Sequence, residues 1–215
     1  MTVAGGESPE EGIRRDAIRL LAIAQSGLAY CHDVFDRQRY EQVQQIGVSL
    51  LSRVADGGTD ELSRLVCAET GYATPKVDVR GAVFDKQNRI LLIRERSDGR
   101  WAMPGGWCDV LESPSEAVIR EIREESGVVA EVVKVAAVLD RERQGNRPPL
   151  PFHVYKLFFV CREISSHAPS ADETLDVRWF PVDAMPELST TRVTAEQVRL
   201  AYAHHLDTGL PTTFD

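Results

Sequence analysis

The spacing of hydrophobic residues divides the chain into a helical N-terminal part and a mixed remainder. Apolar residues recur at helical spacing after Ser8-Pro9-Glu10-Glu11, which combines a capping box with proline at the first helical position. Two further helical patterns follow before the linker Glu69–Pro75. The predicted helices span residues 8–31, 36–54 and 62–66. We therefore expect a small all-α module over residues 1–74.

After the linker the hydrophobic period changes to two. Val77, Val79 and Val83 alternate with polar or small residues, a polar turn follows, and a second apolar run returns, which predicts a β-hairpin. The remaining strands are expected at 128–139, 153–161 and 175–180, and helices at 113–127 and 194–206. One helix between strands and another at the end favour a mixed α/β/α arrangement over residues 75–215.

Composition and charge narrow the class of protein. With 43% apolar and 27% charged residues among 215, the chain is typical of a soluble protein. A formal net charge of -8 and a pI near 5.2 argue against a general nucleic-acid-binding surface. The four cysteines form no Cys-x-x-Cys pair, and no apolar run reaches the length of a membrane span. We expect a soluble cytoplasmic protein without a disulfide framework or a membrane partner.

The predicted helix at 113–127 carries the most informative chemistry. Ser113-Pro114-Ser115-Glu116 opens it with a capping box and Gly127 ends it. At about 100° per residue, Glu121, Glu124 and Glu125 lie on one narrow arc. Like charges at this spacing cost an isolated helix roughly 0.2–0.5 kcal/mol per pair. Either the arc is a solvated face, or a hard cation such as Mg²⁺ or Mn²⁺ sits there.

The residues around this arc support a ligand site. The paired glycines of Trp101-Ala102-Met103-Pro104-Gly105-Gly106 let the backbone turn sharply and approach a ligand, and a carbonyl there can complete a metal shell. Arg120 is expected beside the acidic arc, where a guanidinium orients a carboxylate or contacts a phosphate, and we favour the orienting role. Cys108 is interpreted as a buried or incidental thiol.

The motif from Gly106 to Val128 resembles the Nudix box. Gly106, Glu112 and the run Arg120-Glu121-Ile122-Arg123-Glu124-Glu125-Ser126-Gly127-Val128 match every specified position of Gly-x5-Glu-x7-Arg-Glu-U-x-Glu-Glu-x-Gly-U, where U is a bulky aliphatic residue. The N-terminal helical segment and Glu69–Arg80 are similar to the Nudix branch that contains bacterial CDP-choline pyrophosphatases. Members of that branch also hydrolyse ADP-ribose and use the added helices for dimer contacts.

This resemblance implies an α/β/α Nudix sandwich, with a mixed sheet, that hydrolyses a nucleoside diphosphate linked to another moiety. It implies that Glu121, Glu124 and Glu125 bind Mg²⁺ or Mn²⁺, with the Gly105 carbonyl as a further ligand. Glu112 and Arg120 would belong to the catalytic residues in a structural or supporting role. The general base would be Glu173, in the loop before a later strand, or Glu125. A homodimer is also expected.

Candidate substrate contacts surround the motif, each with an alternative. Arg141 and Arg143 begin a long arginine-rich loop that either contacts phosphate or base or is simply solvated. Trp107 and Trp101 flank the glycines and either stack on a base or pack behind the motif, the latter being favoured for Trp101. On the hairpin, two further guanidinium groups either reach phosphate or face solvent. They are Arg80 and Arg94.

Two other functions fit part of the pattern. A ligand-sensing regulator would bind a nucleotide sugar without cleaving it, but it is expected to lose box carboxylates and to carry a DNA-binding module. Neither sign is present in the sequence. A nucleoside triphosphate sanitising enzyme is disfavoured by the added N-terminal module. Nothing in the sequence distinguishes a cytosine from an adenine substrate.

Overall fold

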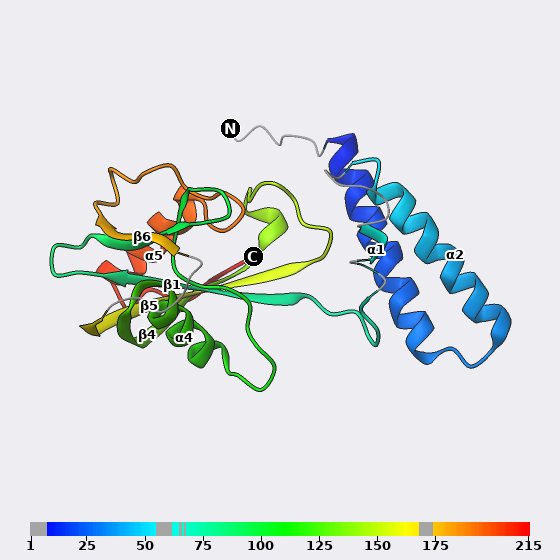
Figure 1. Cartoon of the computed structure of the whole chain (residues 1–215), viewed down its shortest axis with the longest axis horizontal. Coiled ribbons are helices and arrows are strands. Elements are labelled where there is room, and N and C mark those ends of the chain that lie inside the picture. Colours follow the sequence, from blue (N-terminus) through cyan, green and yellow to red (C-terminus); the bar gives the residue numbers. More distant parts are fainter. Residues whose placement is uncertain (1–7, 55–61, 65, 67, 168–173) are drawn as a thin grey trace. The chain divides into compact units, whose positions relative to one another are not determined.

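The computed structural model describes residues 8–54, 62–64, 66, 68–167 and 174–215 and contains two compact units. The first comprises residues 1–75 with 149–153, and the second comprises 76–148 with 154–215 (Figure 1). The predicted C-terminal domain includes 149–153, and the division into 1–74 and 75–215 stays a proposal. Within the described part of the chain, no helix is both long and apolar enough to cross a bilayer.

The first unit is built on two packed helices, α1 (Pro9–Tyr30) and α2 (Val34–Leu51). The predicted capping box at Ser8 is present. The second helix begins earlier than predicted because Asp33 caps it, accepting hydrogen bonds from the Phe35 and Asp36 amides at 2.9 and 3.0 Å. A Cβ at Gly47 would lie 2.8 Å from Leu21 Cγ. The two helices therefore pack closely at this glycine.

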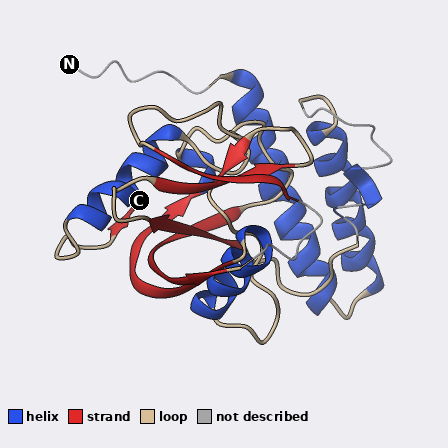
Figure 2. Cartoon of the chain, turned by 60° about the vertical axis from the view of Figure 1, so that its left-hand side comes forward, coloured by secondary structure: helices blue, strands red, loops and turns tan. Residues whose placement is uncertain are grey.

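In its described residues, the second unit is a seven-stranded mixed sheet with a helix on each face (Figure 2). Its strands follow the order β3-β2-β1-β5-β4-β7, and β6 pairs with β2. Strand β1 runs parallel to β5 and antiparallel to β2, which confirms the mixed sheet and the hairpin. The strands are β1 (Lys76–Phe84), β2 (Ile90–Glu95), β3 (Trp101–Ala102), β4 (Val128–Asp140), β5 (Val154–Ser166), β6 (Thr174–Phe180) and β7 (Thr213–Phe214), and the helices are η1 (Arg141–Arg143), α4 (Pro114–Ser126) and α5 (Ala195–Leu206).

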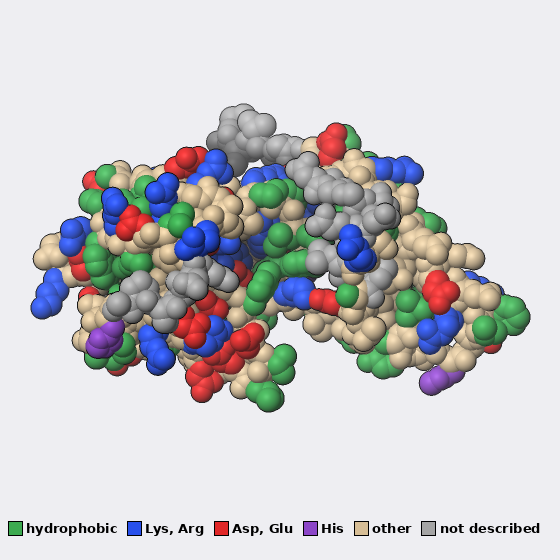
Figure 3. Space-filling model, viewed as in Figure 1, with side chains coloured by type: hydrophobic (Ala, Val, Ile, Leu, Met, Phe, Trp, Pro, Cys, Tyr) green, Lys and Arg blue, Asp and Glu red, His purple; other side chains and the backbone are tan. Residues whose placement is uncertain are grey.

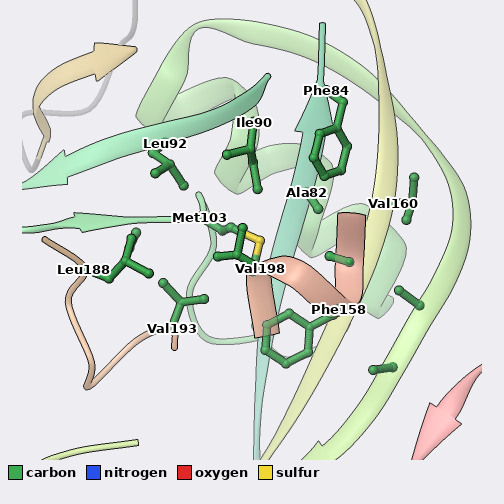
Figure 4. Packing of buried hydrophobic residues seen from close by; sticks show 14 of the residues in the cluster. Ala82, Phe84, Ile90, Leu92, Met103, Phe158, Val160, Leu188, Val193 and Val198 are labelled. Carbon is green, nitrogen blue, oxygen red and sulfur yellow. The ribbon is translucent and has the colours of Figure 1, made fainter. Parts of the chain in front are cut away.

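Alternate residues of β1 face opposite helices, as the strand period requires. Val79 belongs to the buried cluster that includes Val118 and Ile122 of α4. Ala82 belongs to the cluster on the other face, which contains Val198 of α5 and is shown in Figure 4. The sheet is therefore covered on both faces, which confirms the expected α/β/α fold.

A loop takes the place of β2 along most of β1. The pairing of β1 with β2 is confined to the hairpin end, where Phe84 lies opposite Ile90. Further along, the Gly81 amide donates to Pro104 O at 2.9 Å and the Val79 amide donates to Gly106 O at 2.8 Å. Residues 103–106, which we call the glycine segment, are thus held against β1 like an added strand.

Gly81→Ala is expected to destabilise the second unit by about 1–3 kcal/mol because overpacking strains a dense core. The added Cβ would lie 2.5 Å from Ile122 Cδ1 and 3.1 Å from Val118 Cγ2. In an Ile122→Ala background the same substitution should cost less, since the two closest obstructing atoms, both of Ile122, are gone. Urea unfolding of the four proteins measures both free energies, and equal costs in the two backgrounds would contradict this packing.

Candidate active site

Helix α4 presents its carboxylates because both of its ends are fixed and one face is buried. The Ser113–Glu116 capping box is formed, and Gly127 adopts the left-handed conformation at φ 73° that ends the helix. Ile122 is fully buried against the sheet. Acidic side chains gather over α4 on the surface shown in Figure 3. The predicted acidic arc therefore lies beside the glycine segment rather than on an isolated helix.

Arg120 joins most of the predicted acidic residues. Its Nε and Nη2 donate to the two carboxylate oxygens of Glu112 at 2.9 and 3.0 Å. Its Nη1 donates to Glu121 at 3.0 Å and to Glu124 at 3.2 Å. The hydrogen bond from Arg120 lowers the pKa of Glu112, and the same contacts raise the pKa of Arg120. This geometry favours the carboxylate-orienting role over a phosphate contact.

The glycines bring backbone directly against two of the carboxylates. The Gly105 amide donates to Glu125 Oε2 at 2.8 Å. Gly105 has φ 145°, and a Cβ there would lie 2.0 Å from Val79 O, so no other residue fits without moving the backbone. A Cβ at Gly106 would lie 2.8 Å from Glu121 Oε1. Gly105 is therefore required for the backbone to reach the acidic face of α4 (Glu121, Glu124 and Glu125), whereas a side chain at Gly106 would displace the carboxylate of Glu121.

The electrostatics of this face suit a cation. Burial raises the pKa of Glu121 and raises that of Glu125 to about 8, because ionised carboxylates are poorly solvated there. A divalent ion would offset that penalty. The donors are oxygens, the ligand type that Mg²⁺ and Mn²⁺ prefer. In the described residues the Gly105 carbonyl accepts no hydrogen bond and remains available as a further ligand.

The carboxylates are oriented toward Arg120 and Gly105 rather than toward a common centre. Across the described ranges, no three His, Cys, Asp or Glu side chains converge as a ready-made set of metal ligands. This still fits Mg²⁺, which is normally held by a few carboxylates together with water and substrate phosphates. A bound ion would neutralise phosphate oxygens and activate water.

Arg80 does not lie where the sequence prediction placed it. The side chain is 4% exposed, and its Nε and Nη2 donate to Asp78 at 3.0 and 2.7 Å. Its Nη1 donates to Met103 O at 3.2 Å. With these donors engaged inside the protein, the geometry favours a structural role over substrate contact. Asp78 was missed, although a charged pair within an apolar strand was a visible signal.

Arg141 is likewise turned inward. It is 1% exposed, and its Nη2 donates to Pro148 O at 2.7 Å and to Thr191 O at 3.3 Å. The side chain thus holds together the loop that follows β4. Its neighbour Arg143 is exposed and lies 3.6 Å from Asp140. Of the two loop arginines, Arg143 alone keeps an orientation compatible with substrate contact.

The remaining candidates divide between surface and interior. Trp107 is 44% exposed, which is compatible with the predicted stacking on a base. Trp101 is buried with its ring edge-on to Phe180 at 4.8 Å, which confirms the packing interpretation. Arg94 is exposed and donates to Gly99 O at 2.8 Å. Glu173 lies outside the described residues.

The thiol of Cys108 does not add chemistry to this site. It is partly buried, and burial raises its pKa, so the unreactive protonated form is favoured. This agrees with the interpretation as an incidental thiol.

Comparison with known proteins assigns the family. A family model described as a NUDIX domain matches residues 74–201, and a second, described as a UDP-X-like N-terminal oligomerisation domain, matches residues 13–66. The chain belongs to the Nudix family. It is a Nudix hydrolase in which a helical N-terminal region precedes the catalytic fold.

Three relatives illustrate how far the likeness extends. A candidate ADP-ribose pyrophosphatase of Bacillus subtilis, YjhB, is 40% identical over 199 residues, which covers 93% of this chain and 95% of that protein. The crystal structure of a UDP-X diphosphatase is 30% identical with a TM-score of 0.60, covering 96% of this chain and 99% of that one. An ADP-ribose pyrophosphatase structure from Streptococcus suis is 37% identical with a TM-score of 0.60, covering 66% and 100%.

Proposed function

We propose that this Nudix hydrolase is a metal-dependent pyrophosphatase acting on a nucleoside diphosphate linked to another moiety, of the CDP-choline or ADP-ribose type. Water adds to one phosphorus atom, the bond from that phosphorus to the bridging oxygen breaks, and the bridging oxygen leaves with the other phosphoryl group. The products are a nucleoside monophosphate and a phosphorylated moiety. The observation that carries the proposal is the pair of carboxylates, Glu121 and Glu124, on one nitrogen of Arg120 beside buried Glu125.

The relatives support this substrate class without fixing its base. One is named for ADP-ribose and another for UDP-linked compounds, and both cover nearly the whole chain. Both kinds of compound contain a diphosphate bridge between a nucleoside and a second group. We therefore assign binding of the diphosphate bridge to the acidic face. The identity of the base is determined by assay.

Within this proposal, Mg²⁺ or Mn²⁺ is held by Glu121, Glu124 and Glu125, with the Gly105 carbonyl as a further ligand. Arg120, paired to Glu112, keeps two of these carboxylates in place. When bound, the ion supplies charge neutralisation at the diphosphate. Arg94, Arg143 and Trp107 remain candidate substrate contacts, and the cytoplasmic location stays a prediction.

A panel of CDP-choline, ADP-ribose, a UDP-sugar and dNTPs with Mg²⁺ or Mn²⁺ tests the activity. One or more of the diphosphate-linked compounds should yield a monophosphate faster than dNTPs react. Glu124→Gln should lower kcat by about 10²–10³-fold, the loss typical when a charge-stabilising group is removed. Glu131→Gln, which alters a surface partner of Arg162, is the matched control and should leave kcat unchanged.

Two outcomes of this panel would contradict the proposal. Equal, slow hydrolysis of every compound would contradict the proposed substrate class. Tight binding of a nucleotide sugar without hydrolysis would replace the enzyme with a ligand-sensing regulator.

We propose Glu173 as the general base, with Glu125 as the alternative. Glu173→Gln at saturating metal should lower kcat by about 10²–10⁴-fold, the usual contribution of a positioned base, with little change in Mn²⁺ affinity. Exposed Glu163 on β5 provides the control substitution to Gln. Near-wild-type turnover of the Glu173 variant would eliminate it and leave Glu125.

We propose that the chain forms a homodimer through its N-terminal helices. The matching family model is described as an oligomerisation domain, and α1 and α2 expose large apolar side chains, including Ile23, Phe35 and Ile46. Such side chains favour burial at an interface. Light scattering at micromolar concentration should give twice the mass of the 23.9 kDa chain. A monomer at that concentration would overturn this proposal.

A further inference from the structure

Three buried charged side chains on β1 and β5 have no role in the mechanism proposed above. Asp78 and Arg80 are two residues apart on β1 and so share one face of the sheet, and Lys156 of β5 is the direct neighbour of Asp78 in the parallel register. The exposed fractions are 6% for Asp78, 4% for Arg80 and 1% for Lys156. We refer to these three residues as the buried triad.

Every oxygen of the central carboxylate is engaged. Asp78 Oδ1 accepts from Lys156 Nζ at 2.5 Å and from Arg80 Nε at 3.0 Å, and Oδ2 accepts from Arg80 Nη2 at 2.7 Å. Removing charges from water is costly, and a buried ion pair stabilises a fold no better than well-packed apolar residues in many cases. The presence of the triad therefore calls for a contribution other than fold stability.

The triad contacts the start of the glycine segment. The third donor of Arg80, Nη1, binds the carbonyl oxygen of Met103 at 3.2 Å. The Met103 side chain is fully buried in the cluster on the α5 side of the sheet (Figure 4). This residue is thus fixed through both its backbone and its side chain, immediately before Pro104-Gly105-Gly106.

From Met103 the contacts continue to the acidic face. Two residues on, the Gly105 amide donates to Glu125, and Gly106 packs against the carboxylate of Glu121. The segment is hydrogen-bonded to β1, and Gly105 lies directly against Val79, so a shift of the segment would move the groups that contact both carboxylates. The guanidinium of Arg80 also attracts Glu125 electrostatically.

We propose that the buried triad acts as a set of positioning residues for the metal-binding carboxylates. Asp78 and Lys156 hold the guanidinium of Arg80, and Arg80 holds the Met103 carbonyl, so that Gly105 and Gly106 meet Glu125 and Glu121 in a geometry suited to a divalent ion. A lysine at position 80 would not reproduce this arrangement, since only a planar fork binds Asp78 through two nitrogens and Met103 through a third. This inference rests on the proposed metal-dependent function.

The test measures Mn²⁺ binding to the full chain without nucleotide, from the electron paramagnetic resonance signal of free Mn²⁺, and then kcat and KM at saturating Mn²⁺. Arg80→Lys and Asp78→Asn should each raise the Mn²⁺ dissociation constant by about 10–100-fold, as loss of a group supporting metal ligands typically does. The kcat should fall with a smaller change in KM. The double variant should raise the Mn²⁺ dissociation constant by less than the product of the two single-variant factors, because both changes break one network.

Arg89→Lys is the matched control. Arg89 forms the same kind of pair, donating from Nε to Asp85 Oδ2 at 2.7 Å, but this pair is at the exposed turn between β1 and β2, at the end of β1 away from the glycine segment. Its Mn²⁺ affinity and kcat should match those of the unsubstituted protein. Melting temperatures recorded for every variant separate loss of folding from loss of positioning.

If Arg80→Lys fails to fold, Lys156→Met serves in its place, since it removes one hydrogen bond to Asp78 and leaves the pair of hydrogen bonds from Arg80 intact. It should weaken Mn²⁺ binding in the same direction by a smaller factor. Folded variants with lowered melting temperatures but unchanged Mn²⁺ affinity and kcat would show an ordinary structural ion pair and overturn the inference. If the unsubstituted protein neither binds Mn²⁺ nor hydrolyses any substrate, the proposed function itself fails.

Discussion

The site depends on holding mutually repelling carboxylates side by side on one helix face. Glu121 and Glu125 are four residues apart on α4, where like charges destabilise a free helix. The protein offsets this with a fixed cation, Arg120, and with a backbone amide from Gly105. Since burial also disfavours the charged forms, the face is arranged to accept positive charge. The proposed chemistry follows from that requirement.

The sheet provides the space for this arrangement. Because β2 pairs with β1 only at the hairpin end, the rest of that edge is open to the glycine segment, which binds it through Val79 and Gly81. Gly81 also lets α4 approach the sheet closely, and this brings the acidic face within reach of the segment. The same strand carries the carboxylate and guanidinium of the buried triad on its other face. Strand β1 thus positions the glycine segment along its edge and the buried triad on one of its faces.

Much of this could be predicted because the signals are local. The capping box of α4, its terminal glycine and the hairpin are encoded within a few residues, and all are present. Strands β3 and β7 were not predicted because two residues are too few to show an alternating pattern. The interior positions of Arg80 and Arg141 were not foreseen either, since their burial depends on partners distant in the sequence, such as Met103 and Thr191. The alternation along a strand predicts which face of the sheet a side chain lies on, but it does not predict which charged side chains will be buried.

The most direct measurement of the central claim is the position of Mn²⁺ in crystals grown with a non-hydrolysable nucleoside diphosphate analogue, located from anomalous scattering. The account predicts an ion bound by carboxylate oxygens of Glu121, Glu124 or Glu125 and by oxygens of the diphosphate. An ion bound elsewhere, with these carboxylates still on Arg120 and Gly105, would contradict it.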